Sequence, residues 1–326
     1  MVTSAVSEAL DWLKGSKYGY KFKDKTVLFL YILNATIILI FTYAIFGKDK
    51  TLEVYFHRSR LLNWMPFKSV VIKREGVKLL LPMIIDYIIV AKSDWEKEQR
   101  AFLTKLDLQK KDNNNNNVHD DDFIMDVGAN IGFYTILFAK RYPNYKVISI
   151  EASKKIFKQL EQNCNLNDID TSSSSSRRIT LINKAITDVA DKKIDFYEIE
   201  SLSTVLKEFL VDLPTYDKND NALFGNEIVQ TTTIDSIVNS ENITKISLIK
   251  IDVEGAEVLT LKGAIQTLKQ RKIKTMIIEF HSRENYDYII RLLEELGYFI
   301  SFSKERPGIN EDPKYTNGHI IAELTE

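Results

Sequence analysis

The sequence contains very little cysteine and almost no excess of either charge. Its 326 residues include one cysteine, Cys164, so no disulfide can form within the chain. Lys and Arg number 44 and Asp and Glu 45, for a formal net charge of −1. Proteins that bind nucleic acid usually carry a basic excess, so we expect no nucleic-acid partner. The single cysteine fits a reducing compartment but does not exclude an oxidising one.

Several nucleotide-binding and metal-binding patterns are also missing. A dinucleotide-binding loop has glycines spaced G-x-G-x-x-G, but counting from Gly128 the next two glycine positions hold Asn130 and Phe133. No phosphate-binding loop ending in Lys and Ser or Thr follows, which disfavours a nucleotide triphosphatase. No His and Cys cluster has metal-ligand spacing, so we expect no metal site. Whether Asp252 and neighbouring acids hold a divalent ion stays open.

The length allows one large catalytic domain with appendages, and 44% hydrophobic residues are enough for a sizeable core. We predict a basic tail at 1–25, a transmembrane helix at 26–46, a stem at 47–67 and a catalytic domain at 68–326.

One long hydrophobic run stands near the N-terminus. Residues 26–46 read TVLFLYILNATIILIFTYAIF and include no charge. A helix of that length spans roughly 30 Å, about the hydrocarbon thickness of a bilayer. A buried core helix would show a polar face, and a signal peptide would have a shorter apolar stretch. We therefore predict a single-pass membrane protein that contacts the lipid bilayer through this helix.

Charges on the two sides of the predicted helix bear on its orientation. The basic residues before it are Lys14, Lys17, Lys21, Lys23 and Lys25, and those after it are Lys48, Lys50, Arg58 and Arg60. The small excess before the helix favours a cytoplasmic N-terminus. The catalytic domain would then be lumenal in an ER or Golgi membrane, where Asn242 could be glycosylated. A cytosolic catalytic domain is nearly as compatible with the sequence, so the side stays open.

From Phe123 onward, short apolar runs alternate with helical stretches. Strands are predicted at 123–127, 146–150, 179–182, 246–251 and 274–280, and helices at 132–141, 153–165, 256–270 and 284–296. This alternation predicts a doubly wound, mostly parallel α/β sheet. Two last strands, near 298–303 and 318–324, should form a C-terminal antiparallel hairpin. Strands at 193–198 and 228–232 predict a small insertion beside the sheet.

The segment before the sheet is also patterned. Residues 79–91 form an apolar run for which we predict core strands, preceded by a hairpin around residues 75–76. An amphipathic helix is predicted over 94–108. The asparagine tract at 113–117 and the serine tract at 172–176 are polar and of low complexity, which predicts solvent-exposed loops.

The segment FIMDVGANIGFY, residues 123–134, places a glycine loop directly after a strand. Ligands of open α/β sheets bind at the carboxyl ends of strands, and glycines allow a tight turn close to a ligand. The next strand ends at Glu151, where a carboxylate commonly binds ribose hydroxyls. We predict that the cofactor-binding residues are Asp126, Gly128, Asn130, Gly132, Glu151 and Asp252.

A second charged segment, SLIKIDVEGAEVLTLKG at 247–263, also ends a strand. Lys250 and Asp252 stand two residues apart and so share one face of that strand. A structural ion pair followed by helix-start acids is the alternative interpretation. The candidate catalytic residues are Lys250, Asp252, Glu254 and His281, with Glu279 as a further candidate base. Which of them is the general base stays open.

These motifs together resemble one family. The run DVGANIGFYT, the acid Glu151, VQTTTIDSI at 229–237 and IKIDVEGAEVLTLKGA at 249–264 closely resemble the FkbM family of methyltransferases. The likeness covers roughly residues 68–326. It implies a class I (Rossmann-like) methyltransferase fold, S-adenosylmethionine as cofactor, and methylation of a hydroxyl on a glycan or small molecule. The family usually has Glu-Pro after the second strand, where this chain has Glu151 and Ala152.

Two other functions stay open. A membrane-anchored glycosyltransferase would need an Asp-x-Asp motif after a strand, whereas the acidic run at 120–122 lies before one. An inactive methyltransferase-fold scaffold at the membrane is the second alternative, and the intact Asp126, Glu151 and Asp252 argue against it.

Overall fold

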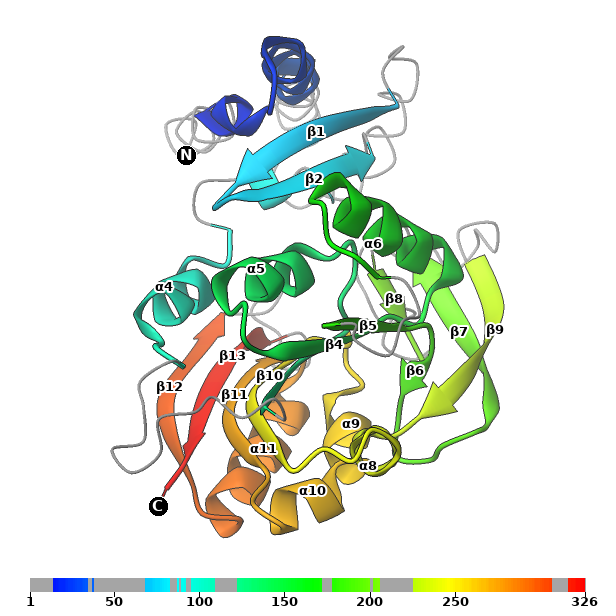
Figure 1. The fold of residues 1–326 in the computed structure, drawn as a ribbon, viewed down its shortest axis with the longest axis vertical. Helices are drawn as coiled ribbons and strands as arrows, with labels where there is room; N and C mark the ends of the chain where they lie inside the picture. The colour runs from blue at the N-terminus through cyan, green and yellow to red at the C-terminus, as the bar shows by residue number, and fades with distance from the viewer. Residues whose placement is uncertain are drawn as a thin grey trace. The chain divides into compact units, whose positions relative to one another are not determined.

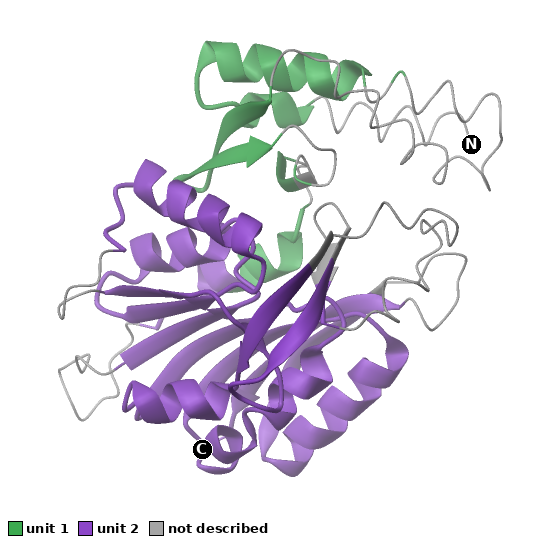
Figure 2. Ribbon diagram, turned by 90° about the vertical axis from the view of Figure 1, so that its right-hand side faces the viewer, with its two compact units in different colours: residues 1–102, 214–217 green, residues 103–213, 218–326 purple. Residues whose placement is uncertain are grey.

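A computed structural model describes most of the chain outside the stem and the low-complexity tracts. The described residues are 14–34, 37, 68–82, 87, 89–91, 95–108, 122–171, 178–199, 202–205, 225–306 and 316–325. They fall into two compact units, one of residues 1–102 with 214–217 and the other of residues 103–213 with 218–326 (Figure 2). The stem at 47–67 and the tracts at 113–117 and 172–176 lie outside the described residues.

The first unit is built on a β-hairpin. Strands β1 (Ser69–Arg74) and β2 (Val77–Pro82) pair antiparallel across the predicted turn, where Glu75 and Gly76 both have positive φ. A two-residue turn of that kind matches the twist of the strands it joins. The short helices η1 (Gly15–Tyr18) and η3 (Ile89–Ala91) belong to the same unit. The core strands predicted over 79–91 are confirmed for 79–82, in β2, and wrong at 89–91, which form η3.

The predicted membrane helix lies only partly within the described residues. Residues 26–34 and 37 are helical, whereas 35, 36 and 38–46 lie outside the described part. Within the described ranges, we find no helix with both the length and the apolar character needed to cross a membrane.

The second unit contains a seven-stranded sheet in the order β12-β13-β11-β10-β3-β4-β5 (Figure 1). Its parallel strands are β3 (Asp122–Val127), β4 (Lys146–Ile150), β5 (Ile179–Ile182), β10 (Lys245–Ile251) and β11 (Ile273–Phe280). Strands β12 (Tyr298–Arg306) and β13 (Asn317–Leu324) are antiparallel to each other, and β13 is antiparallel to β11. The predicted doubly wound sheet with a C-terminal antiparallel hairpin is confirmed.

Helices cover both faces of this sheet (Figures 1 and 2). One face carries α5 (Phe133–Arg141) and α6 (Lys154–Leu166), and the other carries α8 (Ile234–Ser240), α9 (Glu257–Lys262), α10 (Ile265–Lys269) and α11 (Arg283–Glu295). Because both faces are covered, β3 is buried at every position, and its residues 123–125 and 127 are apolar without alternating with polar ones. The amphipathic helix predicted over 94–108 is α4 (Lys97–Lys105).

The helix predicted over 256–270 is divided in two. Its first part ends before Gly263, which packs so closely that an added Cβ would lie 2.1 Å from the carbonyl oxygen of Thr187. The second part begins under a side-chain cap, because the Asp235 carboxylate accepts hydrogen bonds from the N–H groups of Gln266 and Thr267. Helix α8, which supplies Asp235, was not predicted, although Thr233 caps its start by accepting from the Ser236 N–H.

The predicted insertion is a second, four-stranded sheet in the order β6-β9-β7-β8. Its strands are β6 (Ala185–Ile186), β7 (Lys193–Ile199), β8 (Leu202–Thr204) and β9 (Gly225–Thr232). The predicted strands at 193–198 and 228–232 are confirmed as β7 and β9, whereas β6 and β8 are too short to be seen as apolar runs.

The candidate site lies where the winding of the main sheet changes direction, at the neighbouring strands β3 and β10. From β3 the chain moves outward to β4 and β5, and it later returns to β10, which pairs with β3 on the other side. Lys250 of β10 lies opposite Asp126 of β3, so the charged residues predicted from the two motifs are neighbours. A crevice at the carboxyl ends of the strands is expected at such a switch point.

Candidate active site

The glycine loop joins β3 to α5 and lies against the end of β10. Gly128 and Gly132 have φ of +79° and +92°, and Asn130 has a φ of +49°. A Cβ on Gly128 would lie 1.8 Å from the carbonyl oxygen of Asp252, and one on Gly132 would lie 2.4 Å from Leu160. Glycine at 128 is therefore required for close packing of the loop on the Asp252 segment, as well as for its backbone conformation.

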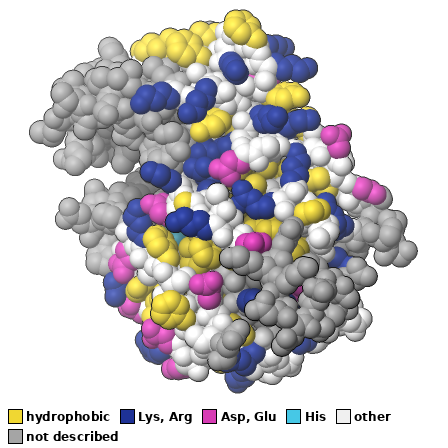
Figure 3. Space-filling model, turned by 60° about the vertical axis from the view of Figure 1, so that its left-hand side comes forward, with side chains coloured by type: hydrophobic (Ala, Val, Ile, Leu, Met, Phe, Trp, Pro, Cys, Tyr) yellow, Lys and Arg dark blue, Asp and Glu magenta, His cyan; other side chains and the backbone are white. Residues whose placement is uncertain are grey.

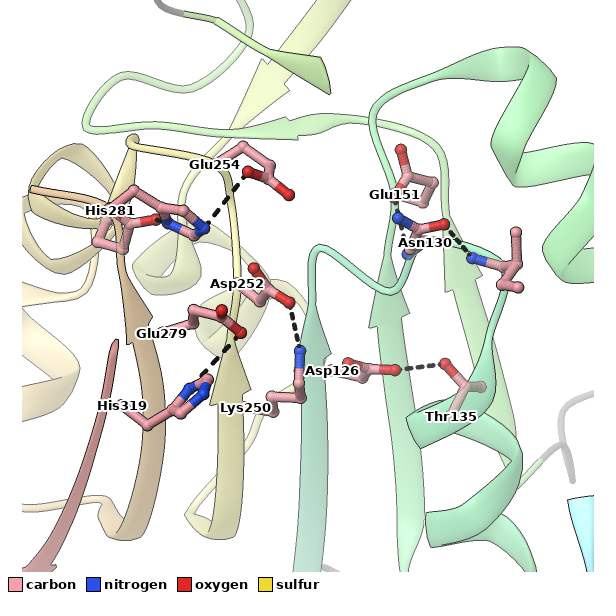
Figure 4. Close-up of polar contacts among 12 residues, drawn as sticks. Asp126, Asn130, Thr135, Glu151, Lys250, Asp252, Glu254, Glu279, His281 and His319 are labelled. Atoms are coloured by element: carbon pink, nitrogen blue, oxygen red, sulfur yellow. Dashed lines mark hydrogen bonds and ion pairs between the residues drawn. The ribbon is translucent and has the colours of Figure 1, made fainter. Parts of the chain in front are cut away.

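Glu151 connects the loop to the end of β4 (Figure 4). One carboxylate oxygen accepts a hydrogen bond from the Asn130 N–H and the other from the Ser153 N–H, both at 2.9 Å. The side chain of Asn130 in turn accepts from the Ile131 N–H at 2.8 Å. Two backbone donors thus fix the orientation of the Glu151 carboxylate at the cleft.

Asp126 lies beneath the loop rather than in its wall. It is 1% exposed, and Oδ2 accepts a hydrogen bond of 2.6 Å from the Thr135 hydroxyl (Figure 4). Its Oδ1 is buried and has no hydrogen-bond partner among the described residues. Burial raises the pKa of Asp126, and the nearby Lys250 ammonium opposes that rise.

A cleft of about 570 Å³, open space included, lies above the strand ends. Its lining residues from the predicted set are Gly128, Asn130, Glu151, Asp252 and Glu254. The predicted residues Asp126, Gly132, Lys250 and His281 do not line it. Its apolar wall comes from Ile150, Ala152, Ala185, Ile186, Phe196 and Val205. Most of that wall belongs to or adjoins the insertion sheet, whose contribution the strand pattern did not reveal.

Lys250 and Asp252 form the expected pair on one face of the end of β10. The Lys250 Nζ lies 2.9 Å from Asp252 Oδ2, and the residue is 4% exposed. The ammonium also lies 4.8 Å from the ring centroid of Tyr134 on α5. Burial alone would raise the pKa of Asp252, but Lys250 and then His281 lower it below its usual value.

His281 stands between two carboxylates at the end of β11 (Figure 4). Its Nδ1 lies 2.9 Å from Glu257 Oε1, and its Nε2 lies 3.3 Å from Glu254 Oε2. Burial would lower the pKa of His281, but Glu254 and Glu257 together raise it well above its usual value. Both ring nitrogens face carboxylate oxygens, an arrangement that favours the doubly protonated ring.

Glu257 is the buried carboxylate that holds this cluster together. The sequence patterns did not identify it as a candidate catalytic or positioning residue. It is fully buried at the start of α9. Its carboxylate accepts from the Gly255 N–H at 3.0 Å and from the Asn285 side-chain amide at 2.6 Å, besides its contact with His281. Three donors thus surround one buried carboxylate, which compensates the cost of burying it.

Glu254 is the partly exposed acid of the cluster. Its side chain is 25% exposed and lines the cleft. Burial raises the pKa of Glu254 to about 7, His281 opposes the rise, and Asp252 and Glu257 add to it. The backbone at Glu254 has a φ of +48°, a conformation that non-glycine residues rarely adopt outside constrained positions.

Glu279, the further candidate base, lies beside this cluster, with a carboxylate oxygen within 4.8 Å of one of Asp252, and it pairs with a histidine on the neighbouring strand. Its Oε2 lies 3.6 Å from Nδ1 of His319, which is 1% exposed on the neighbouring strand β13 (Figure 4). Glu279 and His319 are opposite each other in the β11–β13 register. His319 could have been identified from the sequence only if that register had been known.

The structure also offers a set of possible metal ligands that sequence spacing did not predict. Asp252, Glu254 and His281 each present one ligand atom, and these three atoms lie within 4.8 Å of one another. Carboxylate and imidazole together suit several divalent cations. A metal needs the neutral imidazole ring, so metal binding would compete with protonation of the His281 nitrogen that faces the ion.

A comparison with known families decides the identity of the fold. A family model described as the methyltransferase FkbM domain matches residues 126–300, more than half of the chain. The chain belongs to the FkbM methyltransferase family. The matched region contains the glycine loop, Glu151, the Lys250–Asp252 pair and His281.

Individual relatives are more distant. The FkbM chain is 25% identical over 197 residues to "Methyltransferase 1" of Beauveria bassiana, covering 58% of this chain and 76% of that one. It is 26% identical over 218 residues to "Methyltransferase sdnD" of Sordaria araneosa, with 55% and 74% covered. Among solved structures it is similar to M. jannaschii TYW2 in complex with AdoMet, at 14% identity and a TM-score of 0.38, with 80% and 89% covered.

As an FkbM-family protein, the chain is an S-adenosylmethionine-dependent methyltransferase, and the cleft fits that cofactor. The Glu151 carboxylate, held by two backbone N–H groups, could accept hydrogen bonds from ribose hydroxyls. The apolar wall with Ile186 and Phe196 suits a flat heteroaromatic ring. Asp252 lines the cleft with a carboxylate that could face a cationic sulfonium or ammonium group.

Proposed function

We propose that this FkbM methyltransferase methylates a hydroxyl oxygen on a glycan or small-molecule acceptor, with Glu254 as the general base. The observation that carries the proposal is a cleft-lining carboxylate with a pKa of about 7 beside the loop that packs on Asp252. When bound, S-adenosylmethionine supplies an electrophilic methyl group. The chain's own residues must then align the acceptor oxygen and take its proton.

A general base works best when its pKa is near the operating pH. Among the four candidates, Asp252 is a weaker base because Lys250 lowers its pKa. His281 lies between two carboxylates that raise its pKa, which favours its protonated form, and Lys250 is held in an ion pair. Asp252 and Glu254 both line the cleft, and Glu254 is the one of the two whose pKa is raised, to about 7, rather than lowered.

The proton from the acceptor hydroxyl would move to a carboxylate oxygen of Glu254. His281 supports this transfer as a positioning residue, because its Nε2–H points to Glu254 Oε2 and its Nδ1–H is held by Glu257. A carboxylate that orients an imidazole from its far side fixes both the ring plane and the proton position. Glu257 therefore acts on Glu254 through His281.

Cofactor binding is assigned to the loop and to the adjoining strand ends. Gly128, Asn130 and Gly132 shape the loop, and Glu151 would bind the ribose hydroxyls. Asp252 would face the cationic end of the cofactor. Asp126 supports the loop from below through Thr135, and its unpaired Oδ1 adds negative charge to the same region.

The experiment is a methyl-transfer assay with radiolabelled S-adenosylmethionine and a panel of mono- and oligosaccharides and small hydroxylated metabolites. Mass spectrometry of the product locates the new methyl group. Glu254→Gln should abolish most turnover, whereas Glu295→Gln, an exposed acid at the end of α11, serves as the matched control. A product methylated on nitrogen or carbon, or full activity of Glu254→Gln, would refute the proposal.

A further inference from the structure

The N-terminal helix of the first unit has an apolar face that the protein leaves uncovered. Phe22 is 86% exposed, Phe29 41%, Leu30 38% and Ile37 56%. Spacings of seven, eight and fifteen residues place these side chains on one side of a helix with 3.6 residues per turn. We call these four residues the exposed stripe. Figure 3 shows hydrophobic side chains along the top of the face it draws, where Figure 1 places this helix.

The opposite side of the same helix already contributes to the protein core. Val27, Leu28, Tyr31 and Ile32 are at most 5% exposed. The start of the helix is attached to β1, because Asp24 accepts from the Val71 N–H and the Tyr20 N–H donates to the Val71 carbonyl. Burial of one face thus accounts for the packing of the helix, and the exposed stripe is not needed for it.

Lysines flank the exposed stripe. Lys21, Lys23 and Lys25 are all exposed at the start of the helix. At 100° per residue, Lys23 and Lys25 fall on opposite sides of the line through Phe22 and Phe29. The sequence from 14 to 37 contains one acid, Asp24, which lies on the core side and is hydrogen-bonded there. Figure 3 shows Lys and Arg side chains close to the hydrophobic row.

We propose that the exposed stripe binds an anionic lipid surface, with the helix lying in the plane of the membrane interface. Apolar side chains would enter the acyl boundary, and the lysines beside them would reach the anionic headgroups. A second copy of this chain is a poorer occupant, because a two-fold contact through this face would bring lysines against lysines. The proposal is independent of the acceptor and needs no helix that crosses the bilayer.

The test is co-sedimentation of the full chain with phosphatidylcholine vesicles, with and without phosphatidylserine. The wild type should sediment mainly with the anionic vesicles. The double variant Phe22→Ser/Phe29→Ser should lower the vesicle partition coefficient at least about tenfold, since two aromatic side chains no longer leave water. Replacing Lys21, Lys23 and Lys25 by Gln should lower it by about fivefold for each lysine removed.

Phe299→Ser is the matched control, because Phe299 is a 62% exposed aromatic residue on β12 of the other unit. Circular dichroism and S-adenosylmethionine titration establish that each variant is folded. Wild-type protein that stays in the supernatant with anionic vesicles would overturn the proposal. So would equal sedimentation of wild type and Phe22→Ser/Phe29→Ser, which would place the attachment outside the exposed stripe. A lipid-free dimer that this variant dissociates, without vesicle binding, would assign the stripe to a protein contact instead.

Discussion

His281 donates from Nδ1 to the fully buried carboxylate of Glu257, 2.9 Å away, and this contact fixes the ring whose Nε2 lies 3.3 Å from Glu254. The contact joins the end of β11 to the start of α9 and continues to the cleft. Glu257 itself is held by the Gly255 N–H and by Asn285. The position of the His281 ring beside Glu254 thus depends on a carboxylate that does not line the cleft.

Glu257→Gln should shift the acid limb of the kcat/KM pH profile to lower pH. The negative charge of Glu257 raises the pKa values of both Glu254 and His281, so its removal lowers both. The reduced positioning of His281 should also lower kcat with little change in KM for S-adenosylmethionine. Glu295→Gln should leave the profile unchanged. An unaltered acid limb in a folded Glu257→Gln protein would reduce Glu257 to a structural role.

Glu254→Gln should lower kcat by about 100-fold or more while cofactor affinity stays nearly constant, because a positioned base contributes about 100-fold to 10,000-fold. The wild type should lose activity as the pH falls through about 7. Burial raises the pKa of Glu254 to about 7, so the carboxylate form that accepts the proton predominates above that pH and disappears below it. An unshifted Glu carboxyl has a pKa of about 4.3 and is ionised throughout the range from about pH 5 to 8. A pH profile that is flat over that range would therefore contradict this assignment.

Glu151→Gln should weaken binding of S-adenosylmethionine by about 1–3 kcal/mol, the cost of leaving polar groups unpaired. The amide can no longer accept from both the Asn130 and Ser153 N–H groups and still offer acceptors to ribose. Isothermal titration measures the change. Glu161→Gln, on the exposed side of α6, is the control and should bind the cofactor like the wild type. Equal affinities for both variants would remove Glu151 from the cofactor site.

Lys250→Met should destabilise the fold by about 3–5 kcal/mol, the usual effect of removing one partner of a buried ion pair. The ammonium lies 2.9 Å from Asp252 Oδ2 and also opposes the raised pKa of Asp126. Its loss should raise both pKa values, so the variant should lose less stability at pH 5 than at pH 8. Urea unfolding at the two pH values measures this difference. Equal losses at both pH values would show that Lys250 acts through packing on Tyr134 rather than through charge.

The places of the main-sheet strands along the chain and the position of the glycine loop could be predicted because each depends on local patterns. Apolar runs bounded by turns mark β3, β4 and β10, and two-residue periodicity places Lys250 and Asp252 on one face. The 2.9 Å contact between these two side chains confirms that placement. Sequence patterns are therefore sufficient to predict a contact when the interacting side chains lie within one strand or helix, or directly after it.

The remaining parts of the site depend on contacts between distant elements. The Glu257–His281 contact requires the start of α9 to meet the end of β11, and the Glu279–His319 pair requires the β11–β13 register. The break between α9 and α10 depends on Asp235 of α8 and on the approach of Gly263 to Thr187. Such tertiary contacts override helix propensity, and no periodicity in one segment reports them.

Gly128→Ala should abolish cofactor binding and lower the thermal unfolding temperature of the catalytic unit, and Gly76→Ala separates the two causes. Both glycines have a similar positive φ, +79° for Gly128 and +83° for Gly76, so both substitutions impose the left-handed backbone strain of a non-glycine residue. A Cβ at Gly76 meets nothing within 4 Å, whereas one at Gly128 would lie 1.8 Å from the carbonyl oxygen of Asp252. The clash forces the glycine loop and the end of β10 apart, which displaces Asn130 and Asp252 together.

Gly76→Ala should therefore bind S-adenosylmethionine like the wild type, while Gly128→Ala should show no heat of binding in the same titration. If Gly128→Ala retained wild-type affinity, close packing of the glycine loop on Asp252 would not be required for cofactor binding.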